Sequence, residues 1–470
     1  MRHTLFTLLA VIILISACNR SSDSSNKIYI GGQIVNPNVE YVILSRNNND
    51  LDTLPLDSKN QFGKHLEGLE TGIYTLKHPP ENQILYVEPG DSLMIWLNTL
   101  QFDNSMNFSG RGSEKSSFLL DMFLNNQKDN DLIISNSKIK PGEFAKLTDS
   151  IKKVRADKLK KLEKKYKLSE KFKNIASTVI NYEYYDLRER YTYLIEKYYH
   201  EFTSEVPAGF YNYRDNINFN NEDLQNYYVY TNLIDDYLRS RSIEDCDNIP
   251  DSGRECYNLA NYKNIKRRIL LVDSLINLKQ MKNEFLDRLA SRGITMADTK
   301  EGVDSILNVL EQVNYSYLEE ARELANIHRN YFVGTDVNNR VLLNTNREET
   351  TYNSIIKKPT IVFVWSMHEP GYHMWQHRNI QQLRKKYPDI DFIGVNIDEG
   401  ETKEWLRTVE AYNYDKNFEY QTSKRNIDKK VFRKYIYKIF FISPSGVIVD
   451  GDAKIQSPNF ETEILEFLNR

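Results

Sequence analysis

The sequence predicts a multi-domain α+β protein with a β-rich N-terminal domain (27–112), an α-helical middle region (113–330) and a C-terminal α/β domain (331–470). Short apolar runs between turn residues, then helical periodicity, then buried strands alternating with helices predict these three parts. A chain of 470 residues is long enough for two to four domains. The formal net charge of -3 argues against a nucleic-acid partner, and 31 Tyr and 21 Phe argue against wholesale disorder.

The first residues predict the compartment. A short positive region is followed by an apolar run from Leu5 to Ile15, and small residues then lead to Cys18. This segment resembles a bacterial lipoprotein signal peptide with its lipobox, which implies removal of residues 1–17 and acylation of Cys18. A retained transmembrane anchor is disfavoured, because about eleven apolar residues are too short for a bilayer core of about 30 Å.

Residues 18–26 are polar without hydrophobic period, which is typical of a tether. We therefore expect a lipoprotein that faces an oxidising compartment and whose membrane partner is reached through the N-terminal lipid anchor. By analogy with Bacteroidetes lipoproteins, the expected location is the outer membrane facing the periplasm, with surface display as the alternative.

Residues 27–112 carry strand-length apolar runs that predict a small antiparallel sandwich or barrel. The stretches Tyr86–Leu93 and Phe108–Gly112 resemble the β-rich N-terminal domain of Bacteroidetes lipoproteins whose C-terminal domain is thioredoxin-like.

Residues 113–330 read as helices. An amphipathic stripe runs through a basic segment, 138–173, that holds thirteen Lys and one Arg against five acids. A solvated helix exterior is the favoured interpretation of this segment, and a basic face for anionic lipid headgroups is the alternative. The stripe consists of Phe144, Leu147, Ile151, Val154, Leu162 and Tyr166.

A tyrosine cluster follows, for which packing between helices is favoured over a sugar-stacking platform. It comprises Tyr182, Tyr184, Tyr185, Tyr191, Tyr193, Tyr198, Tyr199, Phe210, Tyr211 and Tyr213.

Cys246 and Cys256 flank a turn-rich loop and are the thiols that remain once Cys18 is lipidated. A structural disulfide across this loop is the favoured interpretation. The alternative is disulfide exchange through this pair, although redox centres favour two-residue spacing at a helix N-terminus.

From about residue 333 the pattern becomes α/β. Buried strands are predicted at 359–365, 391–398 and 439–449, with helices at about 372–387, around Trp405 and at 461–468. The order and spacing of these elements resemble the thioredoxin-like domain of the TlpA/ResA-type disulfide reductases.

The residues that carry the chemistry of that family are replaced. By this resemblance, Glu369 and Tyr372 stand where the two cysteines would be, Tyr437 near the cis-proline and Phe363 at the buried acid. A carboxylate and a phenol cannot undergo thiol–disulfide exchange. Glu369 and Pro370 also favour a helix start. The sequence therefore predicts a degenerate active site.

Three of the eight histidines, His368, His373 and His377, fall within ten residues of this site. Polar, exposed histidines on the first helical turns are the favoured interpretation, because the His-Glu-x-x-His order is not present. A zinc or copper site is the alternative.

These observations together predict a binding protein rather than an enzyme, with no cofactor. The expected partner, besides the membrane, is an envelope protein client bound as extended polypeptide. Disulfide exchange at Cys246 and Cys256, and glycan or metal binding, remain the alternative functions.

Overall fold

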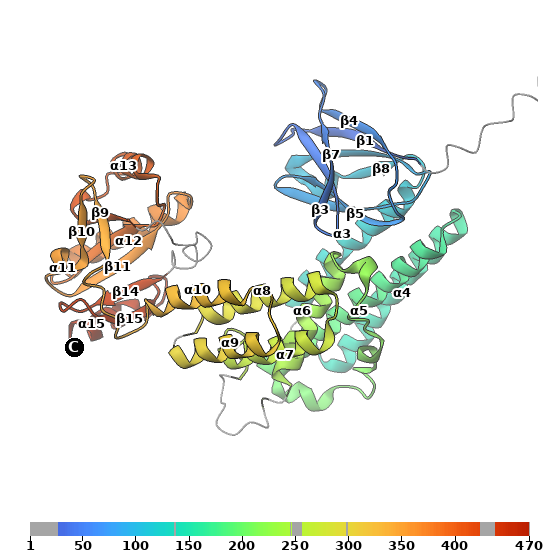
Figure 1. Ribbon diagram of the computed structural model, residues 1–470. Coiled ribbons are helices and arrows are strands. Elements are labelled where there is room, and N and C mark those ends of the chain that lie inside the picture. Colours follow the sequence, from blue (N-terminus) through green and yellow to red (C-terminus); the bar gives the residue numbers. More distant parts are fainter. Residues whose placement is uncertain are drawn as a thin grey trace, which may run out of the picture. The chain divides into compact units, whose positions relative to one another are not determined.

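The computed structural model (Figure 1) describes residues 27–135, 138–244, 246, 256–297, 299–423 and 438–469. The chain divides into two compact units, which we call the N-terminal unit (Met1–Tyr257 with Leu271–Lys282) and the C-terminal unit (Asn258–Leu270 with Asn283–Arg470). Among the helices of the described residues, none is long and apolar enough to cross a membrane.

The N-terminal unit begins with a β-sandwich of two four-stranded sheets, ordered β4-β1-β7-β8 and β3-β2-β5-β6. Strands β1 and β7 pair in parallel, whereas the sequence predicted antiparallel pairing throughout. Parallel pairing is available because the chain between them crosses through the second sheet, a connection much longer than a hairpin. Ile30, Leu44 and Leu93 belong to the core between the sheets. The strands are β1 Ile28–Val35, β2 Tyr41–Arg46, β3 Asn49–Pro55, β4 Gln61–Leu66, β5 Gly72–His78, β6 Glu81–Val87, β7 Ser92–Asn98 and β8 Asn107–Ser109.

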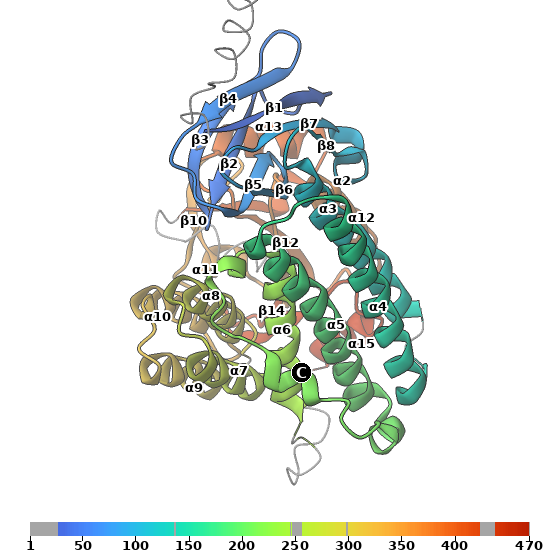
Figure 2. The ribbon, with the colours of Figure 1, turned by 90° about the vertical axis from the view of Figure 1, so that its right-hand side faces the viewer.

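Four long helices complete this unit, and α4 packs beside α5 (Figure 2). The first helix also packs on the sandwich: Ser116 Oγ accepts a hydrogen bond from the Tyr86 N–H at 3.0 Å, and Lys115 pairs with Asp91 at 2.9 Å. The sandwich and these helices belong to one compact unit. The helices are α3 Ser113–Ser135, α4 Pro141–Lys165, α5 Glu170–Tyr198 and α6 Tyr228–Ile243.

The buried face of α4 differs from the predicted stripe. Val154 is 58% exposed and Tyr166 is 36% exposed, whereas Arg155 and Leu159 are buried. Arg155 can lie inside because it forms ion pairs with carboxylates on the neighbouring helices. Hydrophobic periodicity alone could not reveal a buried cation.

Six of the ten aromatic residues of the tyrosine cluster are buried inside the unit, as predicted, whereas Tyr198 is 58% exposed. Tyr182, Tyr184, Tyr185 and Tyr191 are buried, and the Tyr182 ring stacks on Tyr230 with centroids 5.6 Å apart. These buried rings offer no face to a sugar.

A seven-stranded sheet, ordered β10-β9-β13-β12-β11-β14-β15, organises the C-terminal unit. Strands β11, β12 and β13 are parallel, and β14 is antiparallel to β11. The order β12-β11-β14-β15, with a helix between β11 and β12, is that of a thioredoxin fold. The sheet elements are β9 Val341–Asn344, β10 Glu349–Thr351, β11 Thr360–Trp365, β12 Asp391–Asn396, β13 Glu419–Thr422, β14 Ile439–Ile442 and β15 Ile448–Ala453.

One face of this sheet is covered by α12, α13 and α15, which share a core with Phe363, Trp365 and Phe392. The helix α10 packs on the other face, where Leu324 and Ile327 join a core with Val362, Val364 and Phe440. The helices are α7 Tyr262–Leu275, α8 Lys279–Thr295, α9 Lys300–Gln312, α10 Leu318–Arg329, α11 Tyr352–Ile355, α12 Pro370–Lys386, α13 Thr402–Ala411 and α15 Phe460–Leu468.

Candidate functional site

The turn between β11 and α12 lies at the carboxyl ends of three parallel strands, where open α/β sheets bind ligands. Pro370 occupies the first turn of α12, and Glu369 immediately precedes the helix, as the sequence predicted. Glu369 is exposed and Tyr372 is half-buried, with its hydroxyl accepting a hydrogen bond from Gln456 at 3.2 Å. The sequence has no cysteine after Cys256, so the elements from β9 to α15 carry no thiol.

Asp398 holds the turn in place. This buried carboxylate accepts hydrogen bonds from Ser366 Oγ and from the Met367 N–H, both at 2.6 Å. Asn396 donates to the same carboxylate at 2.9 Å and accepts from Gln421 of β13 at 3.0 Å. The network ties the turn to all three parallel strands, so its backbone is fixed before any partner arrives.

A second carboxylate, Glu419, lies fully buried beneath α12. It accepts a hydrogen bond from Trp365 Nε1 at 3.0 Å, and its other oxygen lies 3.2 Å from His377 Nε2. The β-sheet register places Phe363, Gly394 and Glu419 side by side on three strands. Thus β11 presents an apolar side chain at this position, while a carboxylate from β13 reaches under the helix.

Glu419 could not be identified from the sequence as a site residue, although Gly394 gives an indication of it. A Cβ at Gly394 would lie 2.5 Å from Glu419 Oε2, so only glycine lets the carboxylate cross β12. A glycine inside a fully buried strand indicates such a close approach. Nothing in the sequence says which side chain approaches.

His377 and Glu419 share a proton. The Nδ1 atom of His377 lies 2.7 Å from the His373 carbonyl oxygen, which can only accept, so Nδ1 carries a hydrogen. The bond between Nε2 and Glu419 therefore needs one further proton, held by either partner. Tyr414 stacks on the His377 ring at 3.5 Å. The pair is neutral overall, which suits its burial.

The histidines are not the exposed group that the sequence predicted. His373 and His377 are buried because they lie on the helix face that packs on the sheet, and His368 alone of the three is exposed. Burial lowers the pKa of His373 to about 4, with the nearby His377 adding to the effect. Its Nδ1 lies 2.7 Å from the Tyr414 hydroxyl.

The three histidines do not converge on one point. His368 faces Glu401 at 3.0 Å, away from the buried pair. Within the described part of the chain, no group of three or more His, Cys, Asp or Glu side chains is arranged to hold a metal ion. The geometry therefore gives no support to the zinc or copper alternative.

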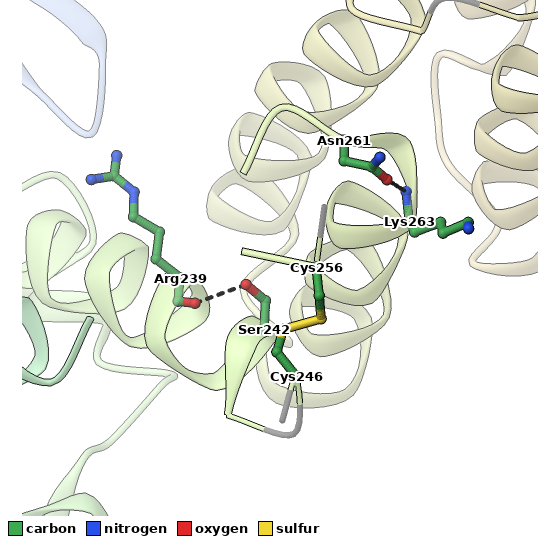
Figure 3. The surroundings of a disulfide bond; sticks show 6 residues. All are labelled: Arg239, Ser242, Cys246, Cys256, Asn261 and Lys263. Carbon is green, nitrogen blue, oxygen red and sulfur yellow. Dashed lines mark hydrogen bonds between the residues drawn. A yellow bond between two sulfur atoms is a disulfide. The ribbon is translucent and has the colours of Figure 1, made fainter. Parts of the chain in front are cut away.

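A disulfide joins Cys246 and Cys256 near the end of α6, where Ser242 Oγ donates to the Arg239 carbonyl at 2.8 Å (Figure 3). Both cysteines are buried, with exposures of 3% and 6%. The two remaining predicted site positions, Cys18 and Tyr437, lie outside the described residues.

A cavity of about 380 Å³ opens on the opposite face of the sheet. Val362, Val364 and Phe440 contribute to its lining, while Phe363 and Trp365 face α12. The cavity is therefore separate from the β11–α12 turn.

The comparisons with known proteins find structural neighbours for the C-terminal part. Solved structures described as a thiol-disulfide oxidoreductase and as the thioredoxin domain of another, both from Bacteroides vulgatus, are 20% and 17% identical, with TM-scores of 0.25 and 0.23. Each match covers 29% of this chain and 98% of the other. A thiol:disulfide interchange protein from a Bacteroides species is 14% identical over 29% of this chain and 91% of its own, with a TM-score of 0.23. No family model and no curated protein matches the chain. The strand order described above, rather than these scores, carries the fold assignment.

Proposed function

We propose that this protein is a lipid-anchored envelope protein whose thioredoxin-like domain binds an extended polypeptide without thiol chemistry. One observation carries the proposal. The β11–α12 turn is held by Asp398 and is exposed, but Glu369 and Tyr372 stand where the TlpA/ResA-type reductases, which the sequence resembles, have their two cysteines. The turn has a fixed backbone but lacks the thiols that disulfide exchange requires, which favours a binding function over catalysis.

The surface around the turn suits a polypeptide. Glu369 is exposed, Tyr372 and Trp375 are half-buried, and the two rings stack at 5.6 Å. A carboxylate beside aromatic rings favours a segment that carries basic and apolar side chains.

Disulfide exchange at Cys246 and Cys256 is not favoured. Exchange requires a thiolate to reach one sulfur of the bond, and both cysteines are buried. A structural role in the N-terminal unit fits this burial better.

Site-specific photocrosslinking in the full chain tests the proposal. A photoreactive residue at Glu369 is expected to capture an envelope protein, whereas the same residue at Glu404, exposed on α13, is not. With the photoreactive residue moved to Tyr372, capture should fall more than tenfold on adding E369K and much less on adding E404K. Equal capture from positions 369 and 404, or no capture, contradicts the proposal.

A redox assay tests the second half of the proposal. The wild-type chain should not accelerate insulin reduction by dithiothreitol. The variant E369C/Y372C should gain a titratable thiol pair, because residues three apart at a helix start can form a disulfide. Reductase activity in the wild-type chain that disappears in C246S/C256S would instead support the exchange alternative.

A further inference from the structure

We propose that the C-terminal end of α4 docks on the anionic headgroups of the membrane that carries the lipid anchor. The docking surface, called here the lysine patch, consists of Lys161, Lys164, Lys165 and Lys167 together with Tyr166. The inference goes beyond polypeptide binding and rests on the lipid-anchor part of the proposed function.

The four lysines of the patch are exposed. Within the part of the chain that the structure describes, no carboxylate lies within ion-pair distance of their ammonium groups. Lys161 and Lys164 project from the side of α4 opposite to buried Arg155 and Leu159, as a turn of 100° per residue requires. The patch therefore faces solvent rather than the core of the unit.

The acidic residues around the patch are engaged by other cations. Lys115 pairs with Glu88 at 2.6 Å, Lys158 with Asp121 at 2.6 Å and Lys171 with Asp223 at 2.9 Å. Within the patch segment, Glu163 is the one carboxylate against four lysines. The surface thus keeps a local excess of about three positive charges, unlike a solvated helix face whose charges pair with one another.

The patch lies near the point where the tether enters the unit. Gly90 donates a backbone hydrogen bond to the Lys27 carbonyl at 3.2 Å, and two residues earlier Glu88 accepts one from Ser169 Oγ. Ser169 follows Lys165, the last residue of α4, by four positions. A short chain of contacts therefore joins the first described residue to the end of α4.

The length of the tether limits how far this region can lie from the membrane. Residues 18–26 span at most about 30 Å when fully extended. An anchor at Cys18 would hold Lys27, and with it the end of α4, close to the bilayer surface. The lysine patch would then lie against the anionic headgroups of the bilayer.

The side chains suit a lipid surface. Lysine ammonium groups bind diffuse negative charge as point charges, and four to eight clustered cations are typical of anionic-lipid recognition. Tyr166, which is 36% exposed with Lys165 Nζ 5.0 Å from its ring centre, has the amphipathic character found at membrane interfaces.

Vesicle binding tests the proposal in a variant that cannot carry the N-terminal lipid anchor. The chain from residue 18 onward, carrying C18S, is mixed with vesicles of phosphatidylcholine alone or with added phosphatidylglycerol. Binding should require phosphatidylglycerol, weaken with salt and fall about fivefold for each lysine neutralised. The test variant is K161Q/K164Q/K165Q/K167Q. Its matched control neutralises four exposed lysines elsewhere, K59Q/K300Q/K385Q/K403Q.

Three outcomes would overturn the docking surface: no binding at low salt, equal binding to both vesicles, or equal loss in the control variant. Circular dichroism melts identify any variant that has not folded. Binding of an acidic polypeptide but not of vesicles would assign the patch to another partner. E369K should leave vesicle binding unchanged, and the patch variant should retain crosslinking at position 369, so each proposal can fail alone.

Discussion

The two units each bury a carboxylate, but they stabilise it differently. In the N-terminal unit, Arg155 of α4 forms ion pairs with both Glu183 and Asp129. In the C-terminal unit, Glu419 meets a histidine and an indole N–H instead. Arginine carries a permanent charge, whereas the histidine and the indole reach Glu419 through hydrogen bonds. The first arrangement depends on ion-pair geometry, and the second depends on hydrogen-bond geometry.

The direction of two pKa shifts separates the units further. Burial raises the pKa of Glu183 to about 8, against the opposing charge of Arg155. Burial lowers the pKa of His373 to about 4. Folding therefore favours protonation of Glu183 and disfavours protonation of His373, so the contributions of these two groups to stability should respond to pH with opposite sign.

Removing the arginine should have the largest effect. Measured above pH 8, where Glu183 is ionised, R155M leaves two buried carboxylates without their cation, which costs about 3–5 kcal/mol of unfolding free energy. Urea unfolding read by pulsed hydrogen exchange and mass spectrometry measures each unit separately. The loss should be confined to the N-terminal unit.

K153M is the matched control for R155M. Lys153 lies two residues away on the same helix and is exposed, so its replacement should change stability by less than about 0.5 kcal/mol. Similar losses in R155M and K153M would show that the buried ion pairs contribute nothing beyond helix propensity.

The pH dependence should sharpen the contrast. The folded His373 has a pKa below the ordinary value of 6.5, so the unfolded chain takes up its proton first as pH falls. Stability of the C-terminal unit is then lost between pH 6.5 and 4, by up to about 3 kcal/mol. For Glu183 the folded pKa lies above 4.5, so stability of the N-terminal unit is lost as pH rises from 4.5 towards 8.

Variants at the two positions check these slopes. H373Q should flatten the acid-side loss in the C-terminal unit, and E183Q should flatten the loss with rising pH in the N-terminal unit. Urea midpoints measured for both units across pH 4–8 provide the data. Unchanged slopes in either variant would assign that unit's pH response to other groups.

The same contrast explains what the sequence could predict. Period-two and period-3.6 patterns in the sandwich, in α12 and in the strands β11, β12, β14 and β15 come from apolar residues, so the positions of these elements could be predicted, whereas the short strands β9, β10 and β13 were not. The buried face of α4 could not, because Arg155 looks like an exposed residue until its partners are known. Glu419 was missed for the same reason. Contacts between elements that are distant in the sequence determine which polar residues are buried. The local hydrophobic periodicity of one element does not contain this information.

Removing the buried acid of the C-terminal unit should cost less than removing Arg155. E419L leaves the Trp365 N–H without its acceptor and the His377 Nε2 atom without its hydrogen-bond partner, which costs about 2–3 kcal/mol. E419Q, whose amide oxygen still accepts one hydrogen bond, should lose less. Red-shifted tryptophan fluorescence should accompany the loss, because Trp365 is fully buried. Equal stability of E419L and the wild type would mean that the pair is not needed for the fold.

The smallest loss of stability should come from replacing Gly394, over which the Glu419 side chain extends. In G394A the new methyl group would lie 2.5 Å from Glu419 Oε2, so the carboxylate must shift away from Trp365 and His377, at a cost of about 1–3 kcal/mol. The double variant G394A/E419A tests this cause, because removing the longer side chain makes room for the methyl group. If the crossing is the reason for the glycine, adding G394A to E419A should cost less than adding it to the wild type. A cost that is the same in both backgrounds would place the clash elsewhere and separate Gly394 from the buried carboxylate.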